Sequence, residues 1–146
     1  MIVLTKKQMD QINLHSEETY PRESCGLLVG QRVGDWIQVC EVHRSENVAM
    51  EPTHRFEVNP QLRFDLERWL RKGSLELVGV YHSHPEGDAL PSCTDIARAW
   101  EPNLIWLITA VKNGSAQTTK GYLLAESLSK FEEAPLKIIS NESSYV

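Results

Sequence analysis

The sequence predicts an α/β fold, more closely an α+β arrangement in which a mixed sheet is flanked by helices. Two segments, at about residues 6–19 and 60–71, carry apolar residues at helical spacing. Near-continuous apolar runs at residues 75–82 and 104–111 have the length of buried strands. Two turn signals between further apolar segments indicate antiparallel hairpins. Helices and hairpins interleaved along one chain are typical of a mixed sheet covered by helices.

The N-terminal part is expected to form a helix followed by a hairpin. Thr5 can cap the helix over residues 6–19, with Met9 and Ile12 on its apolar stripe. Pro21 ends that helix. The hairpin consists of a buried strand at residues 26–30, a turn at Gly34-Asp35 and an antiparallel strand at residues 36–42.

The rest of the chain is expected to alternate between helices and strands. After a loop at residues 46–55 and a short strand at 56–58, Pro60 opens a helix with Leu66 and Leu70 on one face. The later elements are a central strand at 75–82, a helix capped by Ser92, a strand at 104–111, a turn at Asn113-Gly114, and strands near 117–124 and 136–139.

Length and composition describe an ordinary globular chain. Its 146 residues suit a single domain, residues 1–146, and 41% of them are hydrophobic. The net charge of -5 and the lack of a basic tract argue against nucleic acid and membranes as partners. No apolar run approaches the roughly 18 residues that span a bilayer, and the N-terminus does not resemble a signal peptide. Three scattered cysteines argue against a disulfide framework and favour a reducing, cytoplasmic location.

The segment from His82 to Asp95 carries the residues with the clearest chemistry. His82 and His84 are two residues apart, so on a strand their side chains point to the same face, and Pro85 ends that strand. If Ser92 caps the next helix, Asp95 lies in the first turn, where the helix dipole favours an ionised carboxylate. Two histidines and one aspartate suit zinc, and three protein ligands leave the fourth position of a catalytic site for water.

Each of these residues also has a plainer interpretation. A lone His-x-His pair on a strand is more often incidental than metal-binding, and an aspartate in a nearby helix turn adds only modestly. Glu23 by itself is interpreted as a surface carboxylate, and Ser92 as a helix cap. Glu86 and Asp88 are interpreted as solvated loop charges. The spacing alone therefore does not justify a named activity.

Taken together, however, these residues resemble the signature of the JAMM (MPN-plus) zinc metallopeptidase family. The segment reads His82-Ser83-His84-Pro85, six residues, Ser92, two residues and Asp95. The family also carries a glutamate shortly before a Cys-Gly strand, and Glu23-Ser24-Cys25-Gly26 matches that pattern. The resemblance covers about residues 1–125. It implies the compact prokaryotic type of the family and its cytidine-deaminase-like architecture.

The resemblance implies a role for each matched residue. His82, His84 and Asp95 would bind one zinc ion per chain. Glu23 would take a proton from the metal-bound water and deliver it to the leaving amine, while Ser92 would hydrogen-bond the oxyanion of the tetrahedral intermediate. The residue types suit these roles, because zinc lowers the pKa of its water towards about 7 and a carboxylate is then sufficient as the base.

The resemblance also implies a class of substrate. Active relatives hydrolyse a peptide or isopeptide bond after the C-terminal glycine of a ubiquitin-like or sulfur-carrier protein, so the expected partner is such a protein with a glycine-rich tail. The chain is short, with about ten residues between Asp95 and the next expected strand, as in the compact prokaryotic members. A homodimer is a possible assembly.

Three rival functions are weighed against peptide hydrolysis. Zinc nucleoside deaminases carry His-x-Glu followed by Pro-Cys-x-x-Cys, which this sequence does not match, so we reject a deaminase. A non-catalytic scaffold is the minor alternative, since inactive family members have lost metal ligands and this chain keeps every one, together with Glu23. Cys93 could act as a thiol nucleophile, but it has no base partner once both histidines bind metal.

Overall fold

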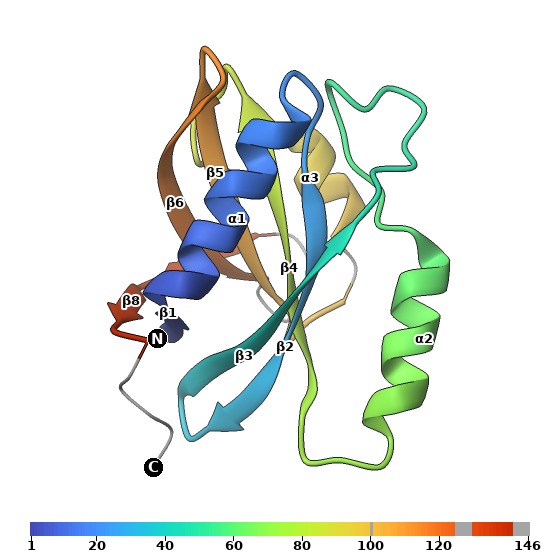
Figure 1. Ribbon diagram of the computed structural model, residues 1–146, viewed down its shortest axis with the longest axis vertical. Coiled ribbons are helices and arrows are strands. Elements are labelled where there is room, and N and C mark those ends of the chain that lie inside the picture. Colours follow the sequence, from blue (N-terminus) through green and yellow to red (C-terminus); the bar gives the residue numbers. More distant parts are fainter. Residues whose placement is uncertain (100, 125–129, 142–146) are drawn as a thin grey trace.

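The computed structural model describes residues 1–99, 101–124 and 130–141. Eight strands in this part of the chain form one sheet in the order β7-β6-β5-β4-β2-β3-β1-β8. Figure 1 shows its central strands from β6 to β3. The elements in chain order are β1 (Ile2–Thr5), α1 (Lys6–Thr19), β2 (Cys25–Val33), β3 (Trp36–Ser45), α2 (Pro60–Leu70), β4 (Glu76–Pro85), α3 (Cys93–Arg98), β5 (Ile105–Lys112), β6 (Ser115–Leu124), β7 (Phe131–Ala134) and β8 (Leu136–Ile139).

Strand β4 lies in the middle of the sheet, antiparallel to β2 and parallel to β5. The two edge strands, β7 and β8, are separated in the chain only by Pro135. The main-chain N–H of Ile2 donates to the Pro135 carbonyl at 2.9 Å. A single stretch of chain therefore pairs with β6 at one edge and with β1 at the other, and it joins the two edges of the sheet.

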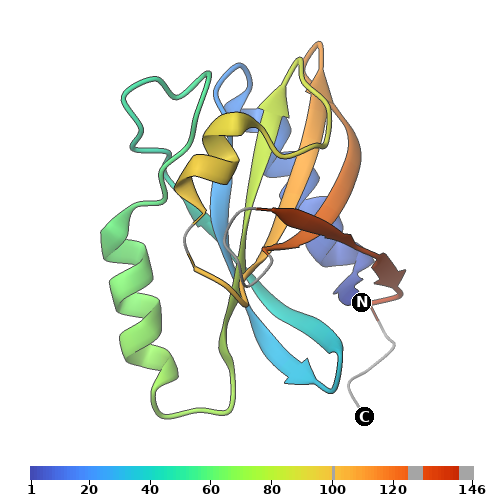
Figure 2. The same cartoon turned by 180° about the vertical axis from the view of Figure 1, so that it is seen from behind.

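Helices cover both faces of the sheet. Helix α1 packs on one face through Ile12, and α2 packs on the opposite face through Leu66, beside α3; Figures 1 and 2 show the two sides. The buried residues of the α1 side are Ile2, Leu4, Ile12, Leu28, Val39, Val78, Tyr81, Ile105 and Leu107. Those of the other side are Leu27, Val29, Leu66, Val80, Ala99, Trp106, Ile108, Tyr122 and Leu124. Successive residues of β2 and β5 thus enter opposite cores, as the two-residue period of a strand requires. In β4 a register shift against β2 skips Val78, and Val78 and Val80 therefore lie in opposite cores.

Most expected elements are confirmed. Thr5 caps α1 and Ser92 caps α3, each through a capping box with the residue three positions on. Both hairpin turns form, with positive φ angles at Gly34, Asn113 and Gly114. Among the described residues, no helix is long and apolar enough to cross a membrane.

The structure contains two strands that the sequence did not predict and lacks one that it did. The sequence does not indicate β1, because its four buried residues show no alternation, nor β7, whose Phe-Glu-Glu-Ala sequence is not a strand-like apolar run. The expected strand at residues 56–58 is wrong, since Val58 forms only an isolated bridge with Asn47. Side chains bind the main chain there instead: the Asn47 carboxamide oxygen accepts from Glu57 N–H, and Arg98 donates to the Phe56 carbonyl.

Candidate active site

Strand β4 places two imidazoles at its C-terminal end. His82 and His84 point to the same face of the sheet, and His82 is completely buried. The Phe56 ring stacks on the His82 ring, with the ring centroids 4.2 Å apart, and Trp106 meets it edge-on at 5.5 Å. Aromatic contacts on two sides fix the orientation of the His82 imidazole.

Helix α3 supplies the carboxylate that faces these imidazoles. Asp95 is the third residue of the helix, and its main-chain N–H donates to Ser92 Oγ at 3.0 Å. In return the main-chain N–H of Ser92 donates to Asp95 Oδ2 at 2.9 Å. The capping box that starts α3 therefore also holds the Asp95 carboxylate in place.

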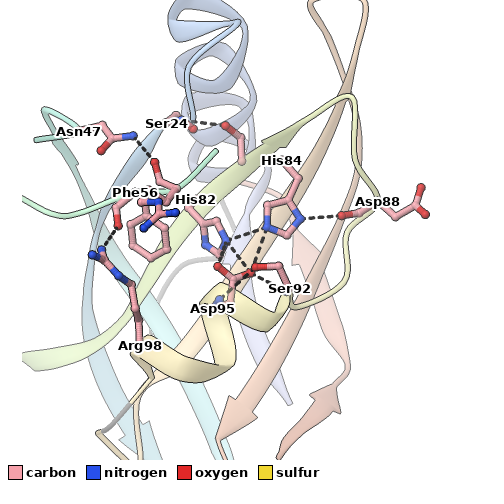
Figure 3. A network of polar contacts seen from close by, with 11 residues as sticks. Ser24, Asn47, Phe56, His82, His84, Asp88, Ser92, Asp95 and Arg98 are labelled. Atoms are coloured by element: carbon pink, nitrogen blue, oxygen red, sulfur yellow. Dashed lines mark hydrogen bonds and ion pairs between the residues drawn. The ribbon is translucent and has the colours of Figure 1, made fainter. Parts of the chain in front are cut away.

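The three side chains converge, as Figure 3 shows. His82 Nε2 lies 3.1 Å from His84 Nε2, and the Asp95 carboxylate lies 3.2 Å from the former and 3.1 Å from the latter. Ligand atoms around a tetrahedral zinc ion with bonds of about 2.0 Å are separated by about 3.3 Å. The spacing of the three atoms therefore fits a tetrahedral metal ion.

The hydrogen bonding of His84 supports the same fit. His84 Nδ1 lies 2.8 Å from the carbonyl oxygen of Asp88, and because a carbonyl can only accept, Nδ1 carries the proton. In the neutral ring the lone pair of Nε2 then faces the Asp95 carboxylate. Two acceptors at this distance need a cation between them, either a proton or a metal ion. The Asp88 carbonyl thus fixes the His84 tautomer in which Nε2 is unprotonated, and this is the form that binds a metal ion.

Burial and hydrogen bonds shift the pKa of each of the three side chains. Burial lowers the pKa of His82, which favours the neutral ring that binds metals. Burial also disfavours the charged form of His84, but its hydrogen bonds to Asp95 and to the Asp88 carbonyl outweigh this and raise its pKa. Although burial opposes ionisation of Asp95, hydrogen bonds from His82 and, when its ring is protonated, from His84 hold the pKa of its carboxyl below the usual range.

Glu23 reaches the same place from the start of β2. The antiparallel register pairs Cys25 with His82, and Ser24 N–H donates to Ser83 Oγ at 2.8 Å. Glu23 therefore lies beside His84, and one ligand atom from each of Glu23, His82 and His84 falls within 4.8 Å of the others. Burial raises the pKa of Glu23 to about 8. A buried carboxylate that gains affinity for a proton is suited to general acid–base work.

The family described as prokaryotic homologs of the JAB domain matches residues 5–121. The chain belongs to this family. Solved structures share the fold of this JAB-family chain. A solution structure of a protein from Desulfitobacterium hafniense matches with a TM-score of 0.84 and 31% identity, covering 97% of this chain and 94% of that one. A JAB1/MPN domain protein from Archaeoglobus fulgidus matches with a TM-score of 0.61 over 96% of this chain and all of the other, and at 18% identity it shows the fold alone.

Curated relatives of the JAB-family chain include proteins named as peptidases. A desampylase from Haloferax volcanii is 39% identical over 88 residues, which make up 60% of this chain and 62% of the relative. A probable TtuB-protein conjugate cleaving protease from Thermus thermophilus is 32% identical over 62% of this chain and 58% of that protein. The match thus spans less than two thirds of either relative. A CysO-cysteine peptidase from Mycobacterium tuberculosis is 24% identical over 95% of this chain and 92% of the relative.

Ser92 lies at the open side of the JAB-family site. The residue is exposed, and its Oγ accepts a hydrogen bond from Asp95 N–H. That bond uses an acceptor lone pair of the hydroxyl, so its O–H remains able to donate to a bound molecule.

Several residues around the site were missed or misjudged by sequence analysis. Glu86 is exposed, as expected of a loop charge, but its carboxylate also accepts from the Tyr20 hydroxyl at 2.6 Å and from Asn113 N–H at 2.9 Å. Asp88 contributes through its main chain, by the carbonyl that binds His84. Phe56 stacks on His82, a contact that its expected place in a short strand at residues 56–58 does not indicate. Except for the bond between His84 and Asp88, which are four residues apart, these contacts join residues far apart in the chain, so local spacing does not indicate them.

Proposed function

We propose that this chain is a zinc metallopeptidase that hydrolyses a peptide or isopeptide bond after the C-terminal glycine of a ubiquitin-like or sulfur-carrier protein. The observation that carries the proposal is the convergence of His82, His84 and Asp95 at tetrahedral spacing, with the Glu23 carboxylate alongside. The names of the relatives support the substrate class: one is a desampylase, one cleaves TtuB-protein conjugates and one is a CysO-cysteine peptidase.

The proposed mechanism assigns one step to each residue. His82, His84 and Asp95 hold the metal, which when bound lowers the pKa of a water molecule and polarises the scissile carbonyl. Glu23 accepts the proton of the attacking water on its carboxylate and later delivers it to the leaving amine. The Ser92 hydroxyl donates to the oxyanion that develops on the substrate. The buried stack of Phe56 on His82 keeps water away from that ring.

A metal assay tests the ligand assignment. The purified chain, reconstituted with zinc, should contain one zinc per chain by elemental analysis. His82→Ala and Asp95→Ala should each abolish this binding, because a site with two remaining ligands is incomplete. An exposed histidine outside the site provides the control, and His54→Ala should bind zinc normally. A wild-type chain without metal after reconstitution would contradict the proposal.

Glu23→Gln separates the base from the ligands. The variant should keep one zinc and the fold, because Glu23 is assigned to proton transfer, yet it should lose turnover. Loss of zinc would make Glu23 a ligand, and an unchanged rate would assign the base to another group. The same measurement decides against the alternative of a non-catalytic scaffold, for which metal and Glu23 would both be dispensable.

A panel of protein substrates tests the specificity. Ubiquitin-like and sulfur-carrier proteins, each extended beyond or fused through the terminal glycine, are incubated with the zinc-loaded chain. Cleavage after that glycine, lost when it becomes valine, is expected, because glycine lets the backbone pass close to the site without a side-chain clash. Free short peptides should be poor substrates, since they lack the binding energy of the folded partner. Equal cleavage of unrelated peptides would indicate a general peptidase.

The assembly and location are proposals as well. We take residues 1–146 to work as one catalytic domain, and light scattering tests the possible homodimer. A reducing cytoplasm is compatible with Cys25, Cys40 and Cys93, which are all free thiols.

A further inference from the structure

The loop between β3 and α2 holds the main chain of Glu23 on both sides. The Glu23 N–H donates to the Pro52 carbonyl at 2.7 Å. The Glu23 carbonyl in turn accepts from the side-chain amide of Asn47 at 3.0 Å. Figure 3 shows Asn47 on the side of the site that carries Phe56. The main-chain N–H and C=O of Glu23 are thus both hydrogen-bonded to the loop of residues 47–57, which begins more than twenty residues further along the chain.

Asn47 is the residue that organises this loop. Its side-chain NH₂ lies within hydrogen-bond distance of three carbonyls, and its side-chain oxygen accepts from two main-chain N–H groups. The three carbonyls are those of Glu23 (3.0 Å), Pro52 (3.3 Å) and Arg55 (3.0 Å), and the two N–H groups are those of Ala49 (3.0 Å) and Glu57 (3.1 Å). One carboxamide therefore ties the two halves of the loop to each other and to Glu23.

Hydrogen bonds to the described residues do not fix Oε1 of the Glu23 side chain. The residue is buried, and its Oε1 has no hydrogen-bond partner among the described residues. A carboxylate without such a bond takes its direction from its own main chain and from packing. The contacts that fix the Glu23 peptide, through Asn47 and Pro52, therefore also fix where the carboxylate points.

We propose that Asn47 is a positioning residue for Glu23, which fixes the base of the proposed reaction by holding the loop of residues 47–57 against the Glu23 main chain. The inference rests on the proposed function, because it concerns the base assigned there. Asn47 touches neither the three metal ligands nor the reacting atoms, so its loss should lower kcat and leave zinc binding intact.

Two substitutions at Asn47 and one control test this role. Asn47→Ala removes all five hydrogen bonds. Asn47→Asp keeps the acceptor for Ala49 and Glu57, which preserves the loop, but turns a carboxylate oxygen towards the carbonyls that the NH₂ had bound. The control is Asn59→Ala: Asn59 follows the same loop and caps α2 by accepting from Gln61 N–H, without any contact to Glu23.

The expected result has a structural and a kinetic part. By hydrogen exchange, the Glu23 amide should exchange roughly tenfold faster in both Asn47 variants and normally in Asn59→Ala. With a cleavable substrate, kcat should fall roughly 10²-fold, as a small misplacement of a reacting group can cause, with little change in KM. In a Glu23→Gln background the same Asn47 substitutions should cause no further loss, because the group they position is gone.

The outcomes separate a wrong inference from a wrong function. Unchanged exchange at Glu23 in both Asn47 variants would overturn the inference, whether or not a substrate is cleaved. Equal losses of kcat in Asn47→Ala and Asn59→Ala, or an undiminished effect without Glu23, would show a general loss of stability instead. Failure of the proposed function would appear elsewhere, as a wild-type chain that binds no zinc or a Glu23→Gln variant with full activity.

Discussion

Ser92 serves the helix and the site with one hydroxyl. Its oxygen caps α3 by accepting from Asp95 N–H, and its main-chain N–H holds the Asp95 carboxylate. Only the first contact depends on the side chain. A substitution at Ser92 therefore weakens the cap and removes the proposed oxyanion donor, while the support of the metal ligand by the main chain survives.

Ser92→Ala should lose roughly 10²-fold in kcat, the effect of removing one oxyanion donor, with KM little changed. It should also lose about 1 kcal/mol of unfolding free energy, because an N-cap is lost. Thr5→Ala is the matched control, since Thr5 caps α1 through the same kind of capping box away from the site. Urea denaturation and steady-state kinetics measure both effects. A Ser92→Ala variant that lost stability but kept its rate would reduce Ser92 to a cap.

For single residues, the sequence was most informative where potential metal ligands also have a spacing that brings them together in the fold. The spacing of His82, His84 and Asp95 predicted their convergence, and the structure brings their ligand atoms within 3.2 Å of one another. The roles of Glu23 and Ser92 remain predictions that came from the resemblance. Asn47 could not be found in this way, because its partners are main-chain groups, which have no signature in the sequence.

Among the elements, β4 does most to place the site, and its packing leaves no room at Gly79. A Cβ added at Gly79 would overlap the main-chain oxygen and the side chain of Ile105 on the parallel neighbour β5. Gly79 therefore lets β4 and β5 approach closely three residues before His82. The histidine end of the strand depends on this pairing.

Gly79→Ala should destabilise the fold by about 1–3 kcal/mol, the usual range for an overpacked core. Gly73→Ala, in the exposed turn before β4, is the control: the nearest atom to an added Cβ is 4.0 Å away. It should change the unfolding free energy by less than about 0.5 kcal/mol. Urea denaturation compares the two variants, and equal stabilities would show that β4 and β5 can shift apart without cost.

Elements with a strong local pattern were predicted well, and those without one were not. The bounds of α1 and β8 agree with the sequence analysis at residues 6–19 and 136–139. Strand β1 ends at Thr5, which is also the cap of α1, and it is too short to show a period. Strand β7 alternates poorly, and its pairing with β6 depends on tertiary contacts.

For the whole molecule, the edge strands β7 and β8, which are joined through Pro135, are expected to stabilise the sheet. Four register pairs link β1 to β8, from Ile2–Leu136 to Thr5–Ile139. Leu136 also packs against the core on the α1 side. Loss of β8 would expose both this part of the core and the unpaired edge of β1.

A chain ended after Pro135 should therefore have a Tm lower by at least about 5 °C, as a loss of one or more kcal/mol produces in a domain of this size. A chain ended after Asn141 is the control. It keeps β8 and also the hydrogen bond from Lys7 N–H to the Asn141 side chain at 2.7 Å, so its Tm should exceed that of the chain ended after Pro135 by this amount. Calorimetry measures both, and a normal Tm without β8 would show that the strand is dispensable.

The same pairing of β1 with β8 has a consequence for how the protein is made. During synthesis the residues of β1 leave the ribosome long before those of β8, because every other described strand and helix lies between them in the chain. Contacts between residues so distant in sequence form slowly, because a long loop must close before they are gained. The nascent chain therefore carries an apolar strand without its final neighbour until β8 has been translated, and the sheet is completed only after that point.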